Sequence, residues 1–160
     1  MAAREPLVIV NGQIRQRPSG DTINIGVTPG SLTFEATNIN GGTINKLSAV
    51  YMSGNDSVSL ATANAAATAK FVGFVDAETT NNSTCNVHFG GVVTGNTAEW
   101  DAVAGTINGL TFNTIYYLDD TNPGQVTAVP PTAADSYVKP VGIALSDTDL
   151  LILQQQSVLL

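Results

Sequence analysis

Short apolar runs separated by turn-forming residues fill residues 109–153, and this stretch constrains the fold most. An apolar run at 115–118 ends in the turn sequence Asp-Asp-Thr-Asn-Pro-Gly, after which apolar and polar residues alternate over 125–128. Two further apolar runs, at 139–145 and 150–153, are separated by Ser-Asp-Thr-Asp. Runs of this length between Gly, Pro, Asn and Asp are typical of β-strands joined by tight turns. The stretch therefore predicts several paired strands.

The same order of features occurs earlier, over residues 46–93. Each stretch has an apolar strand, a turn, an alternating strand, a loop and a return strand, and the sequence KFVG at 70–73 parallels KPVG at 139–142. We interpret residues 46–93 and 109–153 as two divergent internal β-repeats. Neither could bury its apolar face alone, so the two are expected to share one core. The predicted fold is all-β, an antiparallel barrel or sandwich over residues 21–153.

The composition fits a single β-domain and excludes several classes of function. Of the 160 residues, 43% are hydrophobic, enough for one domain with a substantial core. Only 12% are charged and the net charge is −7, so no basic patch is available to bind nucleic acid. The lone cysteine, Cys85, cannot form an internal disulfide.

No membrane or export signal is expected from the first residues. The apolar run at 7–10 is far too short to span a membrane, and residues 1–6 do not have the pattern of a signal peptide. We therefore expect a protein that is made and kept in a cytosol and has no membrane partner.

The N-terminal segment differs in charge from the rest of the chain. Residues 1–20 contain Arg4, Arg15 and Arg17 against Glu5 and are net +2, whereas the remaining 140 residues are net −9. A short apolar run precedes the dipeptide Asn-Gly, a strong hairpin signal, and an alternating run follows it. The segment is predicted to be either a hairpin packed on the body or an arm that contacts a neighbouring molecule.

Other parts of the chain also show the patterns of strands. Alternation predicts strands at 22–27 and 32–36, and residues 71–75 are apolar on both faces, as in a central strand. Residues 86–93 alternate around a Gly pair, which suggests a bulge or a close backbone contact. The segment considered for a helical turn or two is 61–69, which is rich in Ala but lacks an apolar stripe.

The C-terminal residues 154–160 begin with three glutamines and end in Val158, Leu159 and Leu160. One interpretation is a frayed terminus. The other is a tail that packs on a partner subunit and buries its apolar end. The second interpretation makes Val158, Leu159 and Leu160 candidate oligomer-interface residues.

A search for catalytic and metal-binding patterns finds no complete set. His88 is the single histidine, and together with Cys85 it supplies only part of a metal-ligand set. The chain has no Gly-x-Ser-x-Gly motif and no glycine-rich phosphate loop that opens a helix. We expect His88 to be a sheet residue and Cys85 a small, semi-buried hydrophobic residue. We expect no enzymatic activity, no metal site and no cofactor.

Acidic and aromatic residues leave two further kinds of site open. The turns at 119–120 and 147–149 each carry two aspartates, which could bind Ca²⁺ weakly but more often cap their own backbone. Glu99 and Asp101 would be the carboxylates of a polysaccharide-degrading enzyme, but their closeness in sequence does not identify a glycosidase pair. Four aromatic residues could form a carbohydrate platform, although most are expected in the core: Trp100, Tyr116, Tyr117 and Tyr137.

Several stretches resemble parts of bacteriophage virion proteins. Residues 6–22, PLVIVNGQIRQRPSGDT, resemble the start of head-fibre and tail-fibre proteins of tailed phages. Residues 109–144, which include the Gly-Leu-Thr start and the Val-Gly-Ile-Ala return, resemble a β-module common in phage structural proteins. The first repeat resembles small capsid decoration proteins, with their strand, variable turn and Val-Gly return. The resemblance implies no catalytic residue.

This resemblance implies a capsid decoration (cement) protein, which binds the outer surface of a phage capsid and stabilises it. The alternative is a head- or tail-fibre protein that contacts the host surface. The implied partners are the major capsid protein and further copies of this chain in a homotrimer. The implied location is the capsid exterior, after synthesis in the bacterial cytoplasm.

In this interpretation residues 1–20 are a capsid-docking arm, residues 21–153 the β domain and residues 154–160 a C-terminal tail. The arm combines basic side chains with a larger apolar part. The candidate capsid-binding residues are Arg4, Leu7, Val8, Ile9, Ile14, Arg15 and Arg17.

Overall fold

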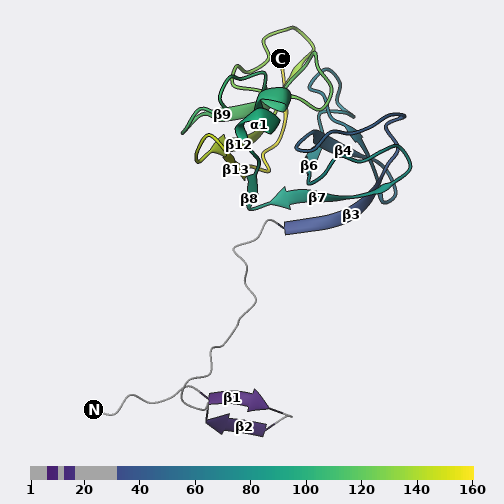
Figure 1. Ribbon diagram of the computed structural model, residues 1–160. Helices are drawn as coiled ribbons and strands as arrows, with labels where there is room; N and C mark the ends of the chain where they lie inside the picture. The colour runs from purple at the N-terminus through teal and green to yellow at the C-terminus, as the bar shows by residue number, and fades with distance from the viewer. Residues whose placement is uncertain (1–6, 11–12, 17–31) are drawn as a thin grey trace.

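The computed structural model describes residues 7–10, 13–16 and 32–160, and it confirms the all-β prediction (Figure 1). The main elements are a closed five-stranded barrel and a five-stranded sheet, with one short helix beside them. The barrel strands are β3 (Leu32–Asn38), β4 (Ala49–Gly54), β5 (Ser57–Leu60), β6 (Phe71–Val75) and β7 (Thr84–Gly90).

The barrel closes in the order β3-β5-β4-β6-β7. All its pairs are antiparallel except β3 and β5, which run parallel where Thr37 lies opposite Ser57. The expectation of a wholly antiparallel barrel is therefore wrong at this one seam. Small and β-branched side chains fill the barrel interior, because five strands leave little room between them. The buried residues of this cluster are Ala36, Ile44, Val50, Val58, Val75, Cys85 and Val87.

The chain leaves the barrel at two consecutive glycines, Gly90 and Gly91. β7 ends at Gly90, and after Gly91 the chain enters β8 (Val92–Thr94), which belongs to the other sheet. Gly91 has φ 79°, a left-handed conformation that glycine adopts at no steric cost. The sequence suggested a bulge or a close backbone contact here, and the register between β3 and β7 does shift beside Gly90. The glycines also separate two strands that belong to different sheets.

The second sheet has the order β10-β9-β12-β13-β8, and all its pairs are antiparallel. Its other strands are β9 (Ile115–Leu118), β10 (Val126–Thr127), β12 (Pro140–Ala144) and β13 (Asp149–Ile152). The pairing order β5-β4-β6-β7 in the barrel matches β10-β9-β12-β13 in this sheet. That the two segments are copies of one unit remains a prediction.

The helix lies between the two predicted repeats, in a stretch to which the sequence analysis assigned no secondary structure. α1 (Thr97–Ala104) begins with a capping box, in which the Asn96 side chain accepts from the Glu99 N–H and Glu99 accepts from the Asn96 N–H, both at 2.9 Å. It ends at Gly105, with φ 61°. The helix considered at 61–69 is not present, and these residues form turns.

One hydrophobic core joins the barrel, the helix and the second sheet. Phe74 of β6, Trp100 of α1 and Tyr116 of β9 are all fully buried in it. The expected shared core is therefore present. β6 lies between β4 and β7 and is buried at four of its five positions, as predicted for a central strand.

The N-terminal strands form a two-stranded sheet of their own. β1 (Leu7–Val10) pairs antiparallel with β2 (Gln13–Gln16), and the pairing of Val10 with Gln13 leaves two residues for the turn, as the Asn-Gly signal predicts. The strand predicted at 22–27 lies outside the described residues.

Candidate binding surfaces

The predicted capsid-binding residues fall mainly on the N-terminal hairpin. Ile9 lies opposite Ile14, and Val8 lies opposite Arg15. Leu7 begins the same strand pair, whereas Arg4 and Arg17 lie outside the described residues. An isolated two-stranded hairpin is at best marginally stable in water. Packing of this hairpin against another surface would therefore stabilise it.

The C-terminal strand continues the β12–β13 hairpin. β11 (Tyr137–Val138) pairs antiparallel with β14 (Val158–Leu159). β11 comes just before Lys139 in the chain, and β12, which pairs with β13, comes just after it. The Leu160 N–H donates to the carbonyl of Ser136 at 3.0 Å.

This pairing fixes the backbone of residues 158–160 but leaves their side chains uncovered. Val158, Leu159 and Leu160 are 61%, 56% and 50% exposed. The tail is therefore a strand of its own chain with three apolar side chains available to a partner. Their role in an oligomer interface remains a prediction.

Lys139 lies at the break between the two paired segments. Lys139 is only 5% exposed, and its ammonium group donates a hydrogen bond to the carbonyl oxygen of Gln155. The Nζ atom also lies 5.9 Å from the ring centroid of Phe71, within cation–π range. Burial lowers the pKa of Lys139. This lysine therefore joins the C-terminal segment to the core and is not a surface charge.

The two residues considered for metal binding both serve the barrel. Cys85 is buried, its thiol lies 3.4 Å from the carbonyl oxygen of Ala36, and burial raises its pKa, so the unreactive thiol form is favoured. His88 pairs with Thr33 and Phe74 as a sheet residue. Burial lowers its pKa, and its buried Nδ1 has no hydrogen-bond partner among the described residues. The expected structural roles of both residues fit this geometry.

Asp119 binds its own turn, and Asp149 binds both its own turn and the neighbouring strand β8. Asp119 Oδ1 accepts from the N–H groups of Thr121 and Asn122, both at 2.7 Å. Asp149 accepts from the hydroxyls of Thr94 at 2.6 Å and Ser146 at 2.9 Å, and these bonds lower its pKa. Both carboxylates therefore stabilise turns, as turn aspartates usually do.

The two carboxylates considered for glycosidase chemistry lie on α1. Asp101 accepts from the hydroxyl of Thr106 and the N–H groups of Asn108 and Gly109, and it thereby holds the loop after the helix. Glu99 caps the helix and also binds Lys46 through both carboxylate oxygens, at 2.8 and 2.9 Å. The Lys46 hydrogen bond, followed by the one from Asn96, lowers the pKa of Glu99. A carboxyl held in its ionised form is poorly suited to act as a general acid.

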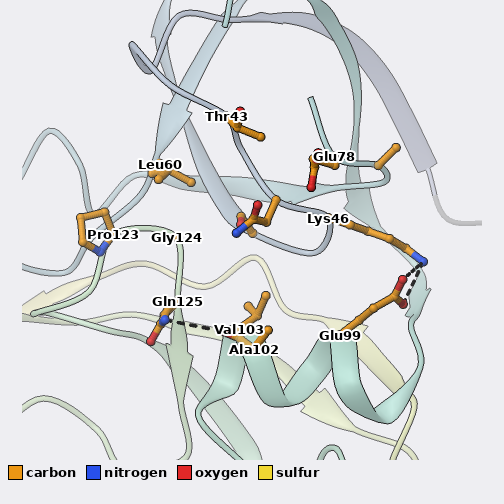
Figure 2. Close-up of a pocket in the computed structure, with 13 residues that line it drawn as sticks. Thr43, Lys46, Leu60, Glu78, Glu99, Ala102, Val103, Pro123, Gly124 and Gln125 are labelled. Carbon is orange, nitrogen blue, oxygen red and sulfur yellow. Dashed lines mark hydrogen bonds and ion pairs between the residues drawn. The ribbon is translucent and has the colours of Figure 1, made fainter. Parts of the chain in front are cut away.

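A cleft of about 490 Å³ lies between the barrel, α1 and the β9–β10 turn (Figure 2). The Lys46–Glu99 ion pair lies at one end, and Gln125 reaches towards the helix carbonyl of Ala102 at 3.5 Å. Gly124 forms the opposite wall, where a Cβ atom would lie only 2.5 Å from the Leu60 side chain.

The cleft could not be found from sequence, because its lining comes from five separate stretches of the chain. The lining consists of residues 43, 45, 46 and 48, residue 60, residues 77–78, residues 99, 102 and 103, and residues 123–125. It offers amide groups, an ion pair and short apolar side chains. The aromatic residues considered for carbohydrate binding are absent from this lining, and Trp100 and Tyr116 are fully buried in the core, as expected.

The sequence matches no protein-family model and no curated protein. Within the described residues, no three His, Cys, Asp or Glu side chains lie close enough together to hold a metal ion. In the same part of the chain, no helix has the length and apolar character needed to cross a membrane.

Proposed function

We propose that this chain is a structural protein of a bacteriophage virion, which binds the outer surface of the capsid and stabilises it. The sequence resemblance to phage decoration and fibre proteins suggests this class. The observation that carries the proposal is the placement of uncovered apolar side chains on paired strands, of which Val158–Leu160 are the clearest case. Surfaces of this kind are typical of adhesion between proteins.

The chemistry of the body supports a binding role. The carboxylates considered above for catalysis or metal binding are each engaged in helix caps or turns: Glu99, Asp101, Asp119 and Asp149. In this proposal the major capsid protein is the partner, and the capsid exterior is the location. Several weak contacts per oligomer would add up to firm attachment through avidity.

The proposed docking segment is residues 1–20. Among the described residues, the buried side chains of both core clusters lie at Ala36 or later. A chain that lacks residues 1–20 is therefore expected to fold. Binding of purified capsids to the full chain and to this truncated chain tests the segment directly. Loss of binding with retained folding supports the proposal, whereas unchanged affinity would place the docking face elsewhere.

Point variants separate the two parts of the proposed contact. Replacing Arg4, Arg15 and Arg17 by Ala should weaken capsid binding modestly and flatten its salt dependence, because exposed ion pairs are weak and screened. Changing Leu7 and Ile9 to Ser should nearly abolish it, since apolar burial contributes more per side chain.

We also propose that the protein works as a homotrimer, with Val158, Leu159 and Leu160 at the interface between subunits. Symmetric assembly would cover these side chains, which are now exposed.

The second candidate is a head or tail fibre that contacts the host. The N-terminal hairpin, in which β1 pairs with β2, could attach the rest of the chain to a virion, and it is therefore compatible with this function. Copy number distinguishes the two candidates. A decoration protein is expected at hundreds of copies per particle and a tail fibre at a handful, and a stained gel of purified virions measures this.

A further inference from the structure

The cleft between the barrel, α1 and the β9–β10 turn contains more hydrogen-bonding groups than the protein itself uses. Among its polar lining side chains, Lys46, Glu99 and Gln125 bind other groups of the chain. The other polar side chains of the lining make no hydrogen bond within the described residues: Thr43, Asn45, Ser48 and Glu78. The cleft therefore has hydroxyl, amide and carboxylate groups available to a ligand.

Ser48 is the most informative of these unpaired groups. It is only 7% exposed, yet its hydroxyl has no partner in the described part of the chain. Within the same residues, the side-chain atom that is both fully buried and unpaired is Nδ1 of His88, so the Ser48 oxygen is not sealed in the core. Ser48 lines the cleft, and its hydroxyl meets solvent there. Buried polar groups normally have a hydrogen-bond partner, which a ligand in the cleft can supply.

The ion pair at one end of the cleft leaves a donor and an acceptor side by side. The Lys46 ammonium contacts Glu99 Oε1 at 2.8 Å and Oε2 at 2.9 Å, which leaves at least one of its three N–H groups unused. Oε2 also accepts from the Asn96 N–H, whereas Oε1 accepts from Lys46 and has a second lone pair. A hydroxyl group both donates and accepts, so it matches this pair.

The charge of the lining excludes an anionic ligand. Lys46 and Glu99 neutralise each other, and Glu78 adds a negative charge. Residues 21–160 contain three lysines and twelve acidic residues, so the rest of the body is also net negative. An anion would be repelled by this field. A cation would find Glu78 alone, on the exposed surface, as its unpaired carboxylate in the lining. The cleft is therefore best suited to a neutral ligand.

We propose that this cleft binds a short neutral saccharide. Sugar hydroxyls both donate and accept hydrogen bonds, and the Thr43 and Ser48 hydroxyls and the Asn45 amide can do both in return. The volume of about 490 Å³ lies within the range of about 300–1,000 Å³ that is usual for small-ligand sites. The inference goes beyond the proposed virion role and does not rest on it.

The apolar part of the lining suits the C–H groups of a sugar ring. Figure 2 shows Thr43 and Glu78 on the side of the cleft opposite to Ala102 and Val103 of α1. A ligand between them would contact polar groups on one side and short apolar side chains on the other. Because the lining contains no aromatic ring for stacking, we expect modest affinity that depends on hydrogen bonds.

Chemical-shift mapping on the ¹⁵N-labelled full chain tests the proposal. The probes are four neutral disaccharides at millimolar concentration: maltose, cellobiose, lactose and chitobiose. We expect at least one of them to shift the amide signals of residues that line the cleft. Salt should leave this binding unchanged, because the ligand is neutral. Capsid docking through the arginines of residues 1–20 would weaken with salt, so the two proposals fail separately.

Variants locate the site. Asn45→Ala and Ser48→Ala should each raise the Kd roughly 5-fold, because each removes a hydrogen-bonding group. Ala102→Trp should abolish binding, since Ala102 is exposed on the helix and a larger side chain there fills the cleft without entering the core. Asn55→Ala is the matched control, at an exposed asparagine between β4 and β5 that lies outside the lining. It should bind like the wild type.

Three results would overturn the proposal. The first is that none of the four disaccharides shifts the signals of the lining residues. The second is binding that persists unchanged in folded Ala102→Trp. The third is tighter binding of putrescine, a small cation, than of any disaccharide, together with its loss in Glu78→Gln. That result would make the cleft a cation site, whereas saccharide binding should survive Glu78→Gln.

Discussion

The indole of Trp100 meets the ring of Phe74 edge-on, with centroids 6.0 Å apart and planes at 80°. Trp100 comes from α1 and Phe74 from the barrel strand β6. The indole N–H also donates to the carbonyl of Thr148, in the turn before β13, at 2.8 Å. One side chain therefore connects the helix, the barrel and the second sheet.

Removing this side chain should destabilise the whole fold. Trp100→Ala is expected to cost about 3–5 kcal/mol, because it leaves a cavity in a close-packed core and an unpaired carbonyl. Trp100→Phe keeps an aromatic ring but loses the hydrogen bond, and should cost less. Urea unfolding measures both, and equal stability of Trp100→Ala and the wild type would contradict the role assigned to this residue.

Lys139 should make stability rise at alkaline pH. Burial lowers its pKa in the folded protein, so the unfolded chain binds the proton more tightly and protonation favours unfolding. Stability should therefore increase as the pH rises through the folded-state pKa towards the unfolded value of about 10.4. Lys139→Met should lack this increase. The difference between the unfolding free energies of the two proteins, measured across this range, isolates the contribution of Lys139. A pH-independent difference would contradict the prediction.

The capping box of α1 should contribute measurably to stability. Asn96→Ala removes the acceptor for the Glu99 N–H and is expected to cost about 0.5–2 kcal/mol. Asn45→Ala, at an exposed asparagine that lines the cleft, is the matched control and should be nearly neutral. Thermal or urea denaturation of both variants checks the expectation, and similar losses at both positions would count against the cap.

Gly73 should tolerate no side chain, because β6 and β7 approach closely there. A Cβ atom at this position would lie 2.1 Å from the His88 carbonyl oxygen, which belongs to the backbone and cannot rotate away. Gly73→Ala is expected to cost at least about 1–3 kcal/mol through overpacking. Gly42→Ala, where no atom lies within 4 Å of the added Cβ, is the control and should be harmless. Comparable unfolding midpoints for the two variants would refute the prediction.

Local sequence signals predicted the local elements well. The dipeptide Asn-Gly marked a two-residue hairpin connection, and the apolar run at 71–75 marked a central strand. The aspartate in the turn after β9 binds its own backbone, as short polar side chains do in turns. In each case the cause lies within a few neighbouring residues.

The helix was missed although it had a sequence signal. α1 buries only Trp100 and Val103, so it has no apolar stripe to reveal its period. The spacing of Asn96 and Glu99 is that of a capping box and could have identified its start. The Ala-rich segment at 61–69 had helical propensity but no capping pair, and propensity alone rarely stabilises a short helix.

The closure of the barrel and the lining of the cleft lay beyond sequence reasoning. The parallel seam joins Thr37 to Ser57, and neither position carries a signal for parallel pairing. The cleft depends on how five stretches pack together. The exposure of Ile115 was hidden for a similar reason, because a short apolar run does not reveal which of its side chains will remain exposed.

The passage from β7 to β8 through Gly91 has a consequence for synthesis. β8 pairs with β13 alone, so Val92–Thr94 must wait for Asp149–Leu151 to emerge from the ribosome before the strand has a partner. The barrel strands, by contrast, are all complete at Gly90. Pairings between distant residues form slowly, and domains often begin to fold from the N-terminal side. The nascent chain can therefore close its barrel early, while β8 stays without a partner until the strands near the C-terminus have been made.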